Sequence, residues 1–318
     1  GWRREEIHFA RVSDGQGFDV FPPAAVGAFV GKSKDGKKLH FFHSSFDLQN
    51  TFKVVPVSGE SAHEVGLSDP SDDPWDHSWT ADSSSLAVLA TGKNGREQLW
   101  SVPVAGGGRV EFNLDLIGTN RLWIWSLSPG CRRVLYQESS STNQGARKAN
   151  LYIAPISLKE SRATGPGNLV FEGWQNPNPT VAEQVGAWSP DGAQVAMPHQ
   201  GDQGHEIWIL SADGSKPKRI IRTPDKAGSR PQWSPDGRMI AFHLTAPDRE
   251  MLQVISVEGG IVRTILTTPQ GQSVPFAWSP AGQEVVAALD GTITGFPITS
   301  GSARIVARLR ENGYETPS

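Results

Sequence analysis

Gln232-Trp233-Ser234-Pro235-Asp236-Gly237 is the stretch that decides the fold, because close copies of it return at a fixed interval. Ala187-Trp188-Ser189-Pro190-Asp191-Gly192 precedes it by 45 residues, and Ala277-Trp278-Ser279-Pro280-Ala281-Gly282 follows it by 45. A repeat of that length cannot bury both of its faces alone, so neighbouring copies must stack on one another. The chain is therefore expected to be a repeat protein.

The residue types of the motif suit a tight turn. Pro235 fixes the backbone, Asp236 can cap the turn through its side chain, and Gly237 can take the positive φ that the turn needs. We expect Trp233 to pack against the next repeat. The motif is therefore interpreted as structural.

Three weaker copies complete the series, and each copy is followed by strand signals. The weaker copies are Trp79-Thr80-Ala81-Asp82, Ser128-Pro129-Gly130 and, without the Trp, Ser33-Lys34-Asp35-Gly36. After each turn comes a short apolar run such as Ile240-Ala241-Phe242, which is typical of a strand covered on both faces. A third strand, a small-residue hairpin such as Gly259-Gly260 and a fourth strand follow. Each repeat thus predicts a four-stranded antiparallel blade.

The expected fold class is all-β: a six-bladed β-propeller forming a single domain over residues 1–318. The repeats span about residues 19–67, 68–115, 116–173, 174–223, 224–268 and 269–310. Residues 1–18 are expected to supply a closing strand or an extension, and a partial seventh blade is the alternative. Residues 311–318 carry no apolar pattern and are expected to form a free tail.

One feature of the motif matches a known family. Trp-Ser-Pro-Asp-Gly, two intervening residues and Ile-Ala-Phe, complete at residues 233–242, resemble the TolB-like β-propeller repeat. That repeat also occurs in the propellers of prolyl-oligopeptidase-family peptidases and of oligogalacturonate lyases. The resemblance covers about residues 19–310 and implies the propeller fold.

Composition limits the partners. The net charge of -3 shows no basic excess, so we expect no nucleic-acid partner. No apolar run approaches the roughly 20 residues that span a bilayer, so we expect no membrane insertion. The single Cys131 excludes an intramolecular disulfide. The first residues lack a secretion signal, so the protein is expected to be cytosolic, or periplasmic or secreted if a leader has been removed.

Candidate binding residues follow from the order of strands in a blade. The connections after second strands, and those between blades, should gather at one face, and in this chain they are long, polar or aromatic. The face is expected to form the mouth of a central channel. The residues predicted to bind a ligand there are His43, Trp75, Asp76, His77, Arg121, Trp123, Glu138, His199, His205, Arg230 and His243.

Three of these histidines suggest a metal. His43, His199 and His243 lie ten or eleven residues beyond the Trp position of their repeats, so they could converge on a divalent ion or act in acid/base chemistry. The alternative is three unrelated polar residues at strand ends. No cofactor is otherwise required.

The main functional hypothesis is a monomeric recognition module for a protein, a peptide or an oligosaccharide, because no complete catalytic motif occurs, including the Gly-x-Ser-x-Gly elbow of hydrolases. The resemblance to oligogalacturonate lyases implies an alternative. Such an enzyme would use a His as base, with His199, His205 and His243 as the nearest residues of that type, and Arg230 or Arg121 as partner of the uronate carboxylate. A third hypothesis is the regulatory propeller of a larger multidomain protein.

Overall fold

The computed structural model describes residues 8–10, 17–19, 30–33, 35–44, 50–57, 63–66, 73–91, 97–112, 122–139, 149–174, 186–227, 231–272, 274–310 and 313–315. The chain forms two compact units. Unit 1 comprises Gly1–Ala10, Gln16–Glu138 and Tyr152–Asn168, and unit 2 comprises Arg11–Gly15, Ser139–Leu151 and Leu169–Ser318. Every regular element in the described ranges is a β-strand. Consequently these ranges contain no helix with the length and hydropathy of a membrane span.

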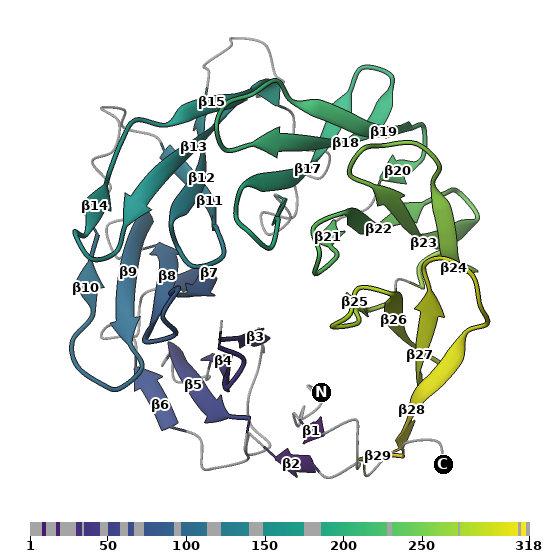
Figure 1. Cartoon of the computed structure of the whole chain (residues 1–318), viewed down its shortest axis with the longest axis horizontal. Coiled ribbons are helices and arrows are strands. Elements are labelled where there is room, and N and C mark those ends of the chain that lie inside the picture. Colours follow the sequence, from purple (N-terminus) through teal and green to yellow (C-terminus); the bar gives the residue numbers. More distant parts are fainter. Residues whose placement is uncertain are drawn as a thin grey trace. The chain divides into compact units, whose positions relative to one another are not determined.

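The strands form six antiparallel blades, the β-propeller fold class that the repeats predict (Figure 1). Blade 1 consists of β3 (Val30–Lys32), β4 (Lys38–Ser44), β5 (Asn50–Pro56) and β6 (His63–Gly66). Blade 2 consists of β7 (Asp73–Trp79), β8 (Ser85–Thr91), β9 (Glu97–Pro103) and β10 (Val110–Glu111). Blade 3 consists of β11 (Leu122–Leu127), β12 (Arg133–Ser139), β13 (Ala149–Ser157) and β15 (Asn168–Trp174), with the short β14 (Arg162–Ala163) beside β13.

The remaining three blades belong to unit 2 and follow the same order. Blade 4 consists of β16 (Ala187–Trp188), β17 (Gln194–Gly201), β18 (Gly204–Ser211) and β19 (Lys218–Thr223). Blade 5 consists of β21 (Gln232–Trp233), β22 (Met239–Thr245), β23 (Arg249–Ser256) and β24 (Arg263–Pro269), with the short β20 (Lys226–Ala227) beside β22. Blade 6 consists of β25 (Phe276–Trp278), β26 (Glu284–Leu289), β27 (Thr292–Pro297) and β28 (Arg304–Arg310).

The two ends of the chain form additional strand pairs. β1 (His8–Ala10) pairs with β2 (Gly17–Asp19) in a two-stranded sheet, so these described residues join no blade. β29 (Gly313–Glu315) pairs with β28 as a fifth strand of the blade 6 sheet. The expectation of a free tail is therefore wrong at those residues, because the open edge of β28 offers unpaired backbone groups to any following segment.

The repeated turn is held by its serine. In blade 5, the Ser234 Oγ donates to the Asp236 carboxylate at 2.6 Å and accepts a bond from the Met239 backbone amide at 2.9 Å. The Gly237 amide donates to the Ser234 carbonyl at 2.9 Å, and Gly237 has a φ of 71°. Hydroxyl, carboxylate and glycine thus close one tight turn, as the motif predicts.

The left-handed position of the turn is not always glycine. Ser83 fills it in blade 2 with a φ of 58°, and Cys131 fills it in blade 3 with a φ of 53°. The carboxylate is likewise missing in blades 3 and 6, where Gly130 and Ala281 replace the aspartate. The turn geometry therefore survives the loss of single residues, which explains why the weaker copies still form blades.

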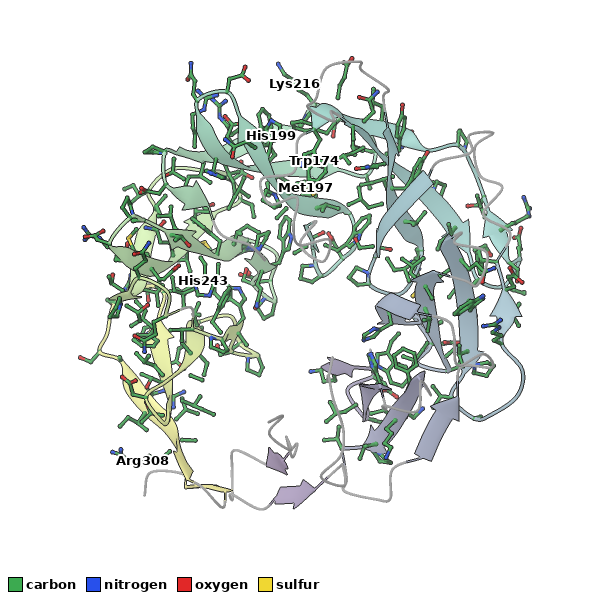
Figure 2. The ribbon with its side chains drawn as sticks, turned by 180° about the vertical axis from the view of Figure 1, so that it is seen from behind. Trp174, Met197, His199, Lys216, His243 and Arg308 are labelled. Atoms are coloured by element: carbon green, nitrogen blue, oxygen red, sulfur yellow. The ribbon has the colours of Figure 1, made fainter. Side chains whose placement is uncertain are left out.

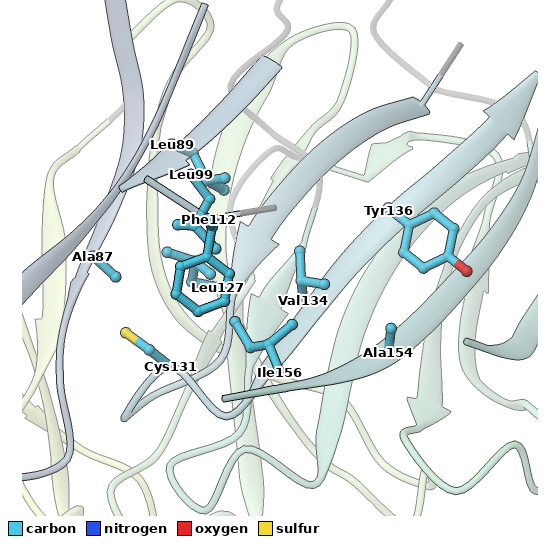
Figure 3. Packing of buried hydrophobic residues seen from close by; sticks show 10 residues of the cluster. All are labelled: Ala87, Leu89, Leu99, Phe112, Leu127, Cys131, Val134, Tyr136, Ala154 and Ile156. Carbon is cyan, nitrogen blue, oxygen red and sulfur yellow. The ribbon is translucent and has the colours of Figure 1, made fainter. Parts of the chain in front are cut away.

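β8 shows why the second strand of a blade is apolar throughout. Leu86 and Val88 pack in a fully buried cluster with Phe52 of blade 1. Ala87 and Leu89 lie on the other face and pack in a second cluster with residues of blade 3 (Figure 3). Because both faces of the blade are covered, alternate residues enter different cores and the usual apolar-polar alternation disappears.

The motif tryptophans connect successive blades through their indole nitrogen. The Trp233 Nε1 donates to the Ala187 carbonyl of blade 4 at 2.7 Å, and the Trp278 Nε1 donates to the Gln232 carbonyl of blade 5 at 3.1 Å. The acceptor is each time the residue before the preceding motif tryptophan. The expectation that Trp233 packs against the next repeat is wrong, because its position in β21 directs it to the preceding blade, where it packs with Ala196.

Candidate functional site

The connections expected to be long loops are short hairpins in unit 2. β17 and β18 pair up to Gly201 and Gly204, so their turn contains two residues. Gly204 has a φ of 125°, and a Cβ there would lie 2.4 Å from the Thr223 carbonyl oxygen, so glycine is required. β22 and β23 are joined by residues 246–248. His199, His205 and His243 therefore lie in strands.

The described histidines of the predicted site do not converge. His199 is directly opposite Glu206 in the sheet, whereas His205 is opposite Gln200, so His199 and His205 lie on opposite faces of blade 4. The His199 ring contacts Phe171 of β15, with ring centroids 5.1 Å apart. His199 thus faces β15.

His243 faces the other neighbour. Figure 2 labels His243. Its ring contacts Phe276 of blade 6, with ring centroids 5.0 Å apart, and its Nε2 lies 2.9 Å from the Val274 carbonyl. Gln194 of blade 4 and Met239 of blade 5 are equivalent, because the backbone amide of each donates to the turn serine. His199 lies five residues beyond Gln194, whereas His243 lies four residues beyond Met239. A one-residue offset in a strand moves a side chain to the opposite face, so the common spacing from the Trp did not mean a common direction.

A metal site among these histidines finds no support in the geometry of the described side chains. Nowhere in the described ranges do three or more His, Cys, Asp or Glu side chains gather in a group suited to a metal ion. Burial lowers the pKa of His243, more than its bond to the Val274 carbonyl and the nearby Glu250 raise it. The His43 side chain lies outside the described residues, and its backbone belongs to β4.

The other predicted residues also lie mostly in strands. Trp75 and Asp76 belong to β7, Trp123 to β11 and Glu138 to β12, and for these four the structure describes the backbone alone. The loop expected before Trp79 is therefore strand from Asp73 onward, wrongly assigned because its Asp and Pro residues are typical of turns. Arg121 and Arg230 lie outside the described residues. His77, also in β7, packs against His40 with ring centroids 4.6 Å apart.

A polar cluster in unit 2 surrounds Glu206 on β18. Its side chain is 3% exposed and binds two arginines. The Arg222 Nε donates to Oε1 at 2.6 Å, the Arg219 Nη1 donates to the same oxygen at 3.2 Å, and the Trp208 Nε1 donates to Oε2 at 2.8 Å. The Arg222 Nη1 also donates to the Gln203 side chain in the hairpin at 2.6 Å. We call His199, Gln203, Glu206, Trp208, Arg219 and Arg222 the blade 4 surface.

A β-bulge brings both arginines to the same face. Glu206 is opposite Arg222 in the sheet and Trp208 is opposite Arg219, with a register shift between Ile207 and Trp208. In a regular strand, residues three apart point to opposite faces, so Arg219 and Arg222 could not both reach Glu206. The bulge adds one residue and re-aims the side chains. The sequence carries no separate signal for this shift, which is why the cluster was missed.

Glu206 stays ionised despite its burial. Burial alone raises the pKa of a carboxyl, but the hydrogen bonds from Arg222 and Trp208 and the charges of Arg222 and Arg219 outweigh it, and the pKa of Glu206 lies below its ordinary value. Each arginine side chain is 38% exposed. The buried carboxylate therefore holds two guanidinium groups in place while each still faces water.

Comparisons with known proteins agree on the fold. No protein-family model matches the chain, and no curated protein matches its sequence. Among solved structures, a putative TolB from Agrobacterium tumefaciens shares 20% identity over 94% of this chain and 100% of that chain, with a TM-score of 0.57. The β-propeller domain of the Trilobed protease from Pyrococcus furiosus shares 13% identity over 95% and 89% of the two chains, with a TM-score of 0.62. An oligogalacturonate lyase in complex with manganese shares 16% identity over 96% and 84%, with a TM-score of 0.63.

Identities this low establish a shared fold, and they do not establish a shared activity. The chain has a six-bladed propeller fold, and it shares this fold with the putative TolB. The neighbours include a TolB, a protease propeller and a lyase, so a propeller of this fold can serve as a binding or as an enzymatic module.

Proposed function

We propose that this propeller is a recognition module that binds an acidic segment of a protein or peptide partner through the blade 4 surface. The observation that carries the proposal is the pair of half-exposed arginines held by one buried carboxylate. Two guanidinium groups against one carboxylate leave an excess positive charge. A partner carboxylate would restore the balance through charge-assisted hydrogen bonds.

The arginines are pre-oriented, which favours binding. Arg222 uses Nε and Nη1 for Glu206 and Gln203, and among the described residues its Nη2 makes no hydrogen bond. The Arg219 guanidinium lies over the Trp208 ring, 5.6 Å from its centroid. A side chain already fixed in position loses less conformational entropy when a ligand binds. The two spare donor edges thus form a ready contact for a carboxylate.

Aromatic side chains beside the arginines add apolar contact. Trp208 is partly buried and packs edge-on against Phe171, with ring centroids 5.2 Å apart. Arginine next to Trp is a common composition of binding hot spots. An acidic segment that also carries an apolar or aromatic residue would therefore bind better than a free carboxylate.

The test is a calorimetric titration with a hexaglutamate peptide as the probe, at about 50 mM salt so that screening is limited. Arg222→Gln should weaken binding at least about tenfold, because a charge-assisted hydrogen bond contributes about 1.5–3 kcal/mol. Arg304→Gln is the matched control: Arg304 also lies on an outer strand and pairs with an acid, Glu284, at 2.7 Å. Equal binding by both variants, or no binding by the wild type, would remove the proposal.

The second candidate is a lyase acting on uronate-containing glycans. The observation in its favour is that His199, Glu206 and Arg222 occupy one cross-strand row on the same face, with the imidazole and the guanidinium on either side of Glu206. Incubation with polygalacturonate, followed by ultraviolet absorbance, would detect the unsaturated product. Turnover that is lost in His199→Ala and kept in His205→Ala would favour the lyase over the recognition module.

A further inference from the structure

The contact between blades 1 and 2, within unit 1, departs from the pattern of the other blades at His40. His40 lies two residues beyond the strand residue that bonds the turn serine, and the same position holds Ala87 in blade 2, Ala196 in blade 4 and Ala241 in blade 5. Those alanines are fully buried, and His40 is 2% exposed. An imidazole therefore occupies a position that blades 2, 4 and 5 fill with a methyl group, and that holds Leu135 in blade 3 and Val286 in blade 6.

Gly31 makes the room for this imidazole. Gly31 is directly opposite His40 in the sheet, and a Cβ on Gly31 would lie 2.2 Å from the His40 Cε1. In blade 4 the corresponding pair is Ala187 and Ala196. The smaller residue at Gly31 thus compensates for the larger residue at His40, and the imidazole fits into the core without a steric clash.

The inter-blade hydrogen bond is lost at the same place. Trp233 and Trp278 donate to the carbonyl of the residue before the preceding motif position, but among the described residues the Trp79 Nε1 has no hydrogen-bond partner. The His40 ring lies against the Trp79 ring instead, with centroids 5.5 Å apart. Neither ring nitrogen of His40 makes a hydrogen bond of good geometry with the described residues, although the nearby Gly31 backbone raises the His40 pKa slightly against the larger effect of burial. Unpaired buried polar atoms of this kind weaken a core.

His77 completes the group. Its ring meets His40 edge-on at 4.6 Å between centroids and also contacts Phe52 at 5.2 Å. Burial is the main cause, and the neighbouring His77 the second, of the lowered pKa of His40, which is about 3. Burial also lowers the pKa of His77 to about 4. Both imidazoles are therefore neutral in the folded protein near neutral pH.

The charged groups around the two rings can be named element by element. On β4, Lys38 points to the same face as His40, and its Nζ lies 5.9 Å from the Trp79 ring centroid and donates to the Ser83 carbonyl. On β3 and β5, Lys32 and Lys53 alternate to the other face. On β6, His63 is in register with Val54, and β7 also contains Asp73 and Asp76; the side chains of these three residues lie outside the described residues. Among the described charges, Lys38 opposes protonation of the rings, and Asp35 in the turn before β4 offsets part of the Lys38 charge.

We propose that the contact of His40 and His77 between blades 1 and 2 is an acid-sensitive latch, which holds the blades together when both rings are neutral and releases them when either ring gains a proton. A proton on either ring would place a charge in an apolar core beside the other ring and close to Lys38. The opened state exposes both rings to water, where they bind protons at the ordinary histidine pKa of about 6.5. Acid therefore favours opening.

The sign and size of the effect follow from linkage. Because the pKa of both rings is lower when the latch is closed, the stabilisation is complete above about pH 6.5 and is lost as the pH falls toward the lowered values. When the pH falls from about 7.5 to about 5, the equilibrium constant for opening rises about thirtyfold for each ring that stays neutral in the closed state. Two such rings give up to about a thousandfold.

Hydrogen exchange read by mass spectrometry at these two pH values, corrected for the intrinsic exchange rate, tests the latch. Amides of β3, β4 and β7 should show the acid response, and those of β22 and β23 in blade 5 serve as the internal reference. The double variant Gly31→Ala, His40→Ala introduces the alanine pair of blade 4. Its acid-induced increase in the equilibrium constant for opening should be about thirtyfold smaller than that of the wild type.

The single variants keep the test decisive. His40→Ala should lose the same share if the double variant does not fold, while Gly31→Ala alone should destabilise blade 1 because its Cβ meets the imidazole. The proposal is overturned if the alanine variants keep the full acid response, or if blade 5 opens with acid as much as blades 1 and 2.

Discussion

Replacing Trp233 with Phe isolates the hydrogen bond between successive blades. The change removes the Nε1 donor, 2.7 Å from the Ala187 carbonyl, and part of a ring that is 8% exposed. The lost bond costs about 1–1.5 kcal/mol, and the smaller ring costs about another 1 kcal/mol of apolar burial. We expect a total loss of about 2–2.5 kcal/mol in the free energy of unfolding.

Trp79→Phe is the matched comparison, because Trp79 occupies the same motif position but its Nε1 makes no hydrogen bond with the described residues. It loses a similar ring area and also removes an unpaired buried N–H, so its cost should be about 1 kcal/mol or less. Urea unfolding followed by far-ultraviolet circular dichroism gives both values, and hydrogen exchange in β16 and β21 confirms that blades 4 and 5 are the ones affected. Equal costs for the two variants, or a larger cost for Trp79→Phe, would refute the assignment of the inter-blade bond.

Three further outcomes follow from the turns and from the buried carboxylate. Gly282→Ala should destabilise more than Gly36→Ala in thermal unfolding: both have a positive φ, costing about 1 kcal/mol, but only at Gly282 does the new Cβ approach a neighbour, 3.3 Å from a proline ring. Ser234→Ala should cost about 1–2 kcal/mol in urea unfolding and more than Ser279→Ala, because Ser234 loses a carboxylate bond as well as an amide bond. Glu206→Gln should lower the free energy of unfolding above about pH 4.5 and flatten the acid side of the stability curve. A carboxyl whose pKa is lowered by folding stabilises the protein above its ordinary pKa, and this contribution is lost as the pH falls through the lowered pKa. A pH series of urea midpoints that is unchanged in the variant would contradict this.

The fold could be predicted because its signal is local and repeated. The turn serine, the aspartate and the left-handed glycine make their bonds within five residues, so each copy reports its own turn whatever the rest of the chain does. Even where Ser83 or Cys131 replaces the glycine, the following apolar run marks the next strand. The direction of the motif tryptophan could not be obtained in this way, since it depends on which face of the sheet each neighbour covers.

The candidate site depended on details that the sequence does not encode locally. His199 and His243 were grouped by their distance from the Trp, but a difference of one residue places them on opposite faces. Arg219 and Arg222 meet at Glu206 only because of a bulge in β19. His40 lies in the strand after the weakest turn motif, and its alignment with the alanines of blades 2, 4 and 5 was the available signal that it is buried.

The most direct test of the recognition module asks where the partner binds. Hydrogen exchange of the wild-type protein, with and without the hexaglutamate probe, locates the surface that the probe covers. If the probe binds to the blade 4 surface, exchange should slow at the Gly201–Gly204 hairpin and in β19. In the double variant Arg219→Gln, Arg222→Gln, the probe should leave exchange at these sites unchanged. Protection confined to other blades, or unchanged in that double variant, would contradict it.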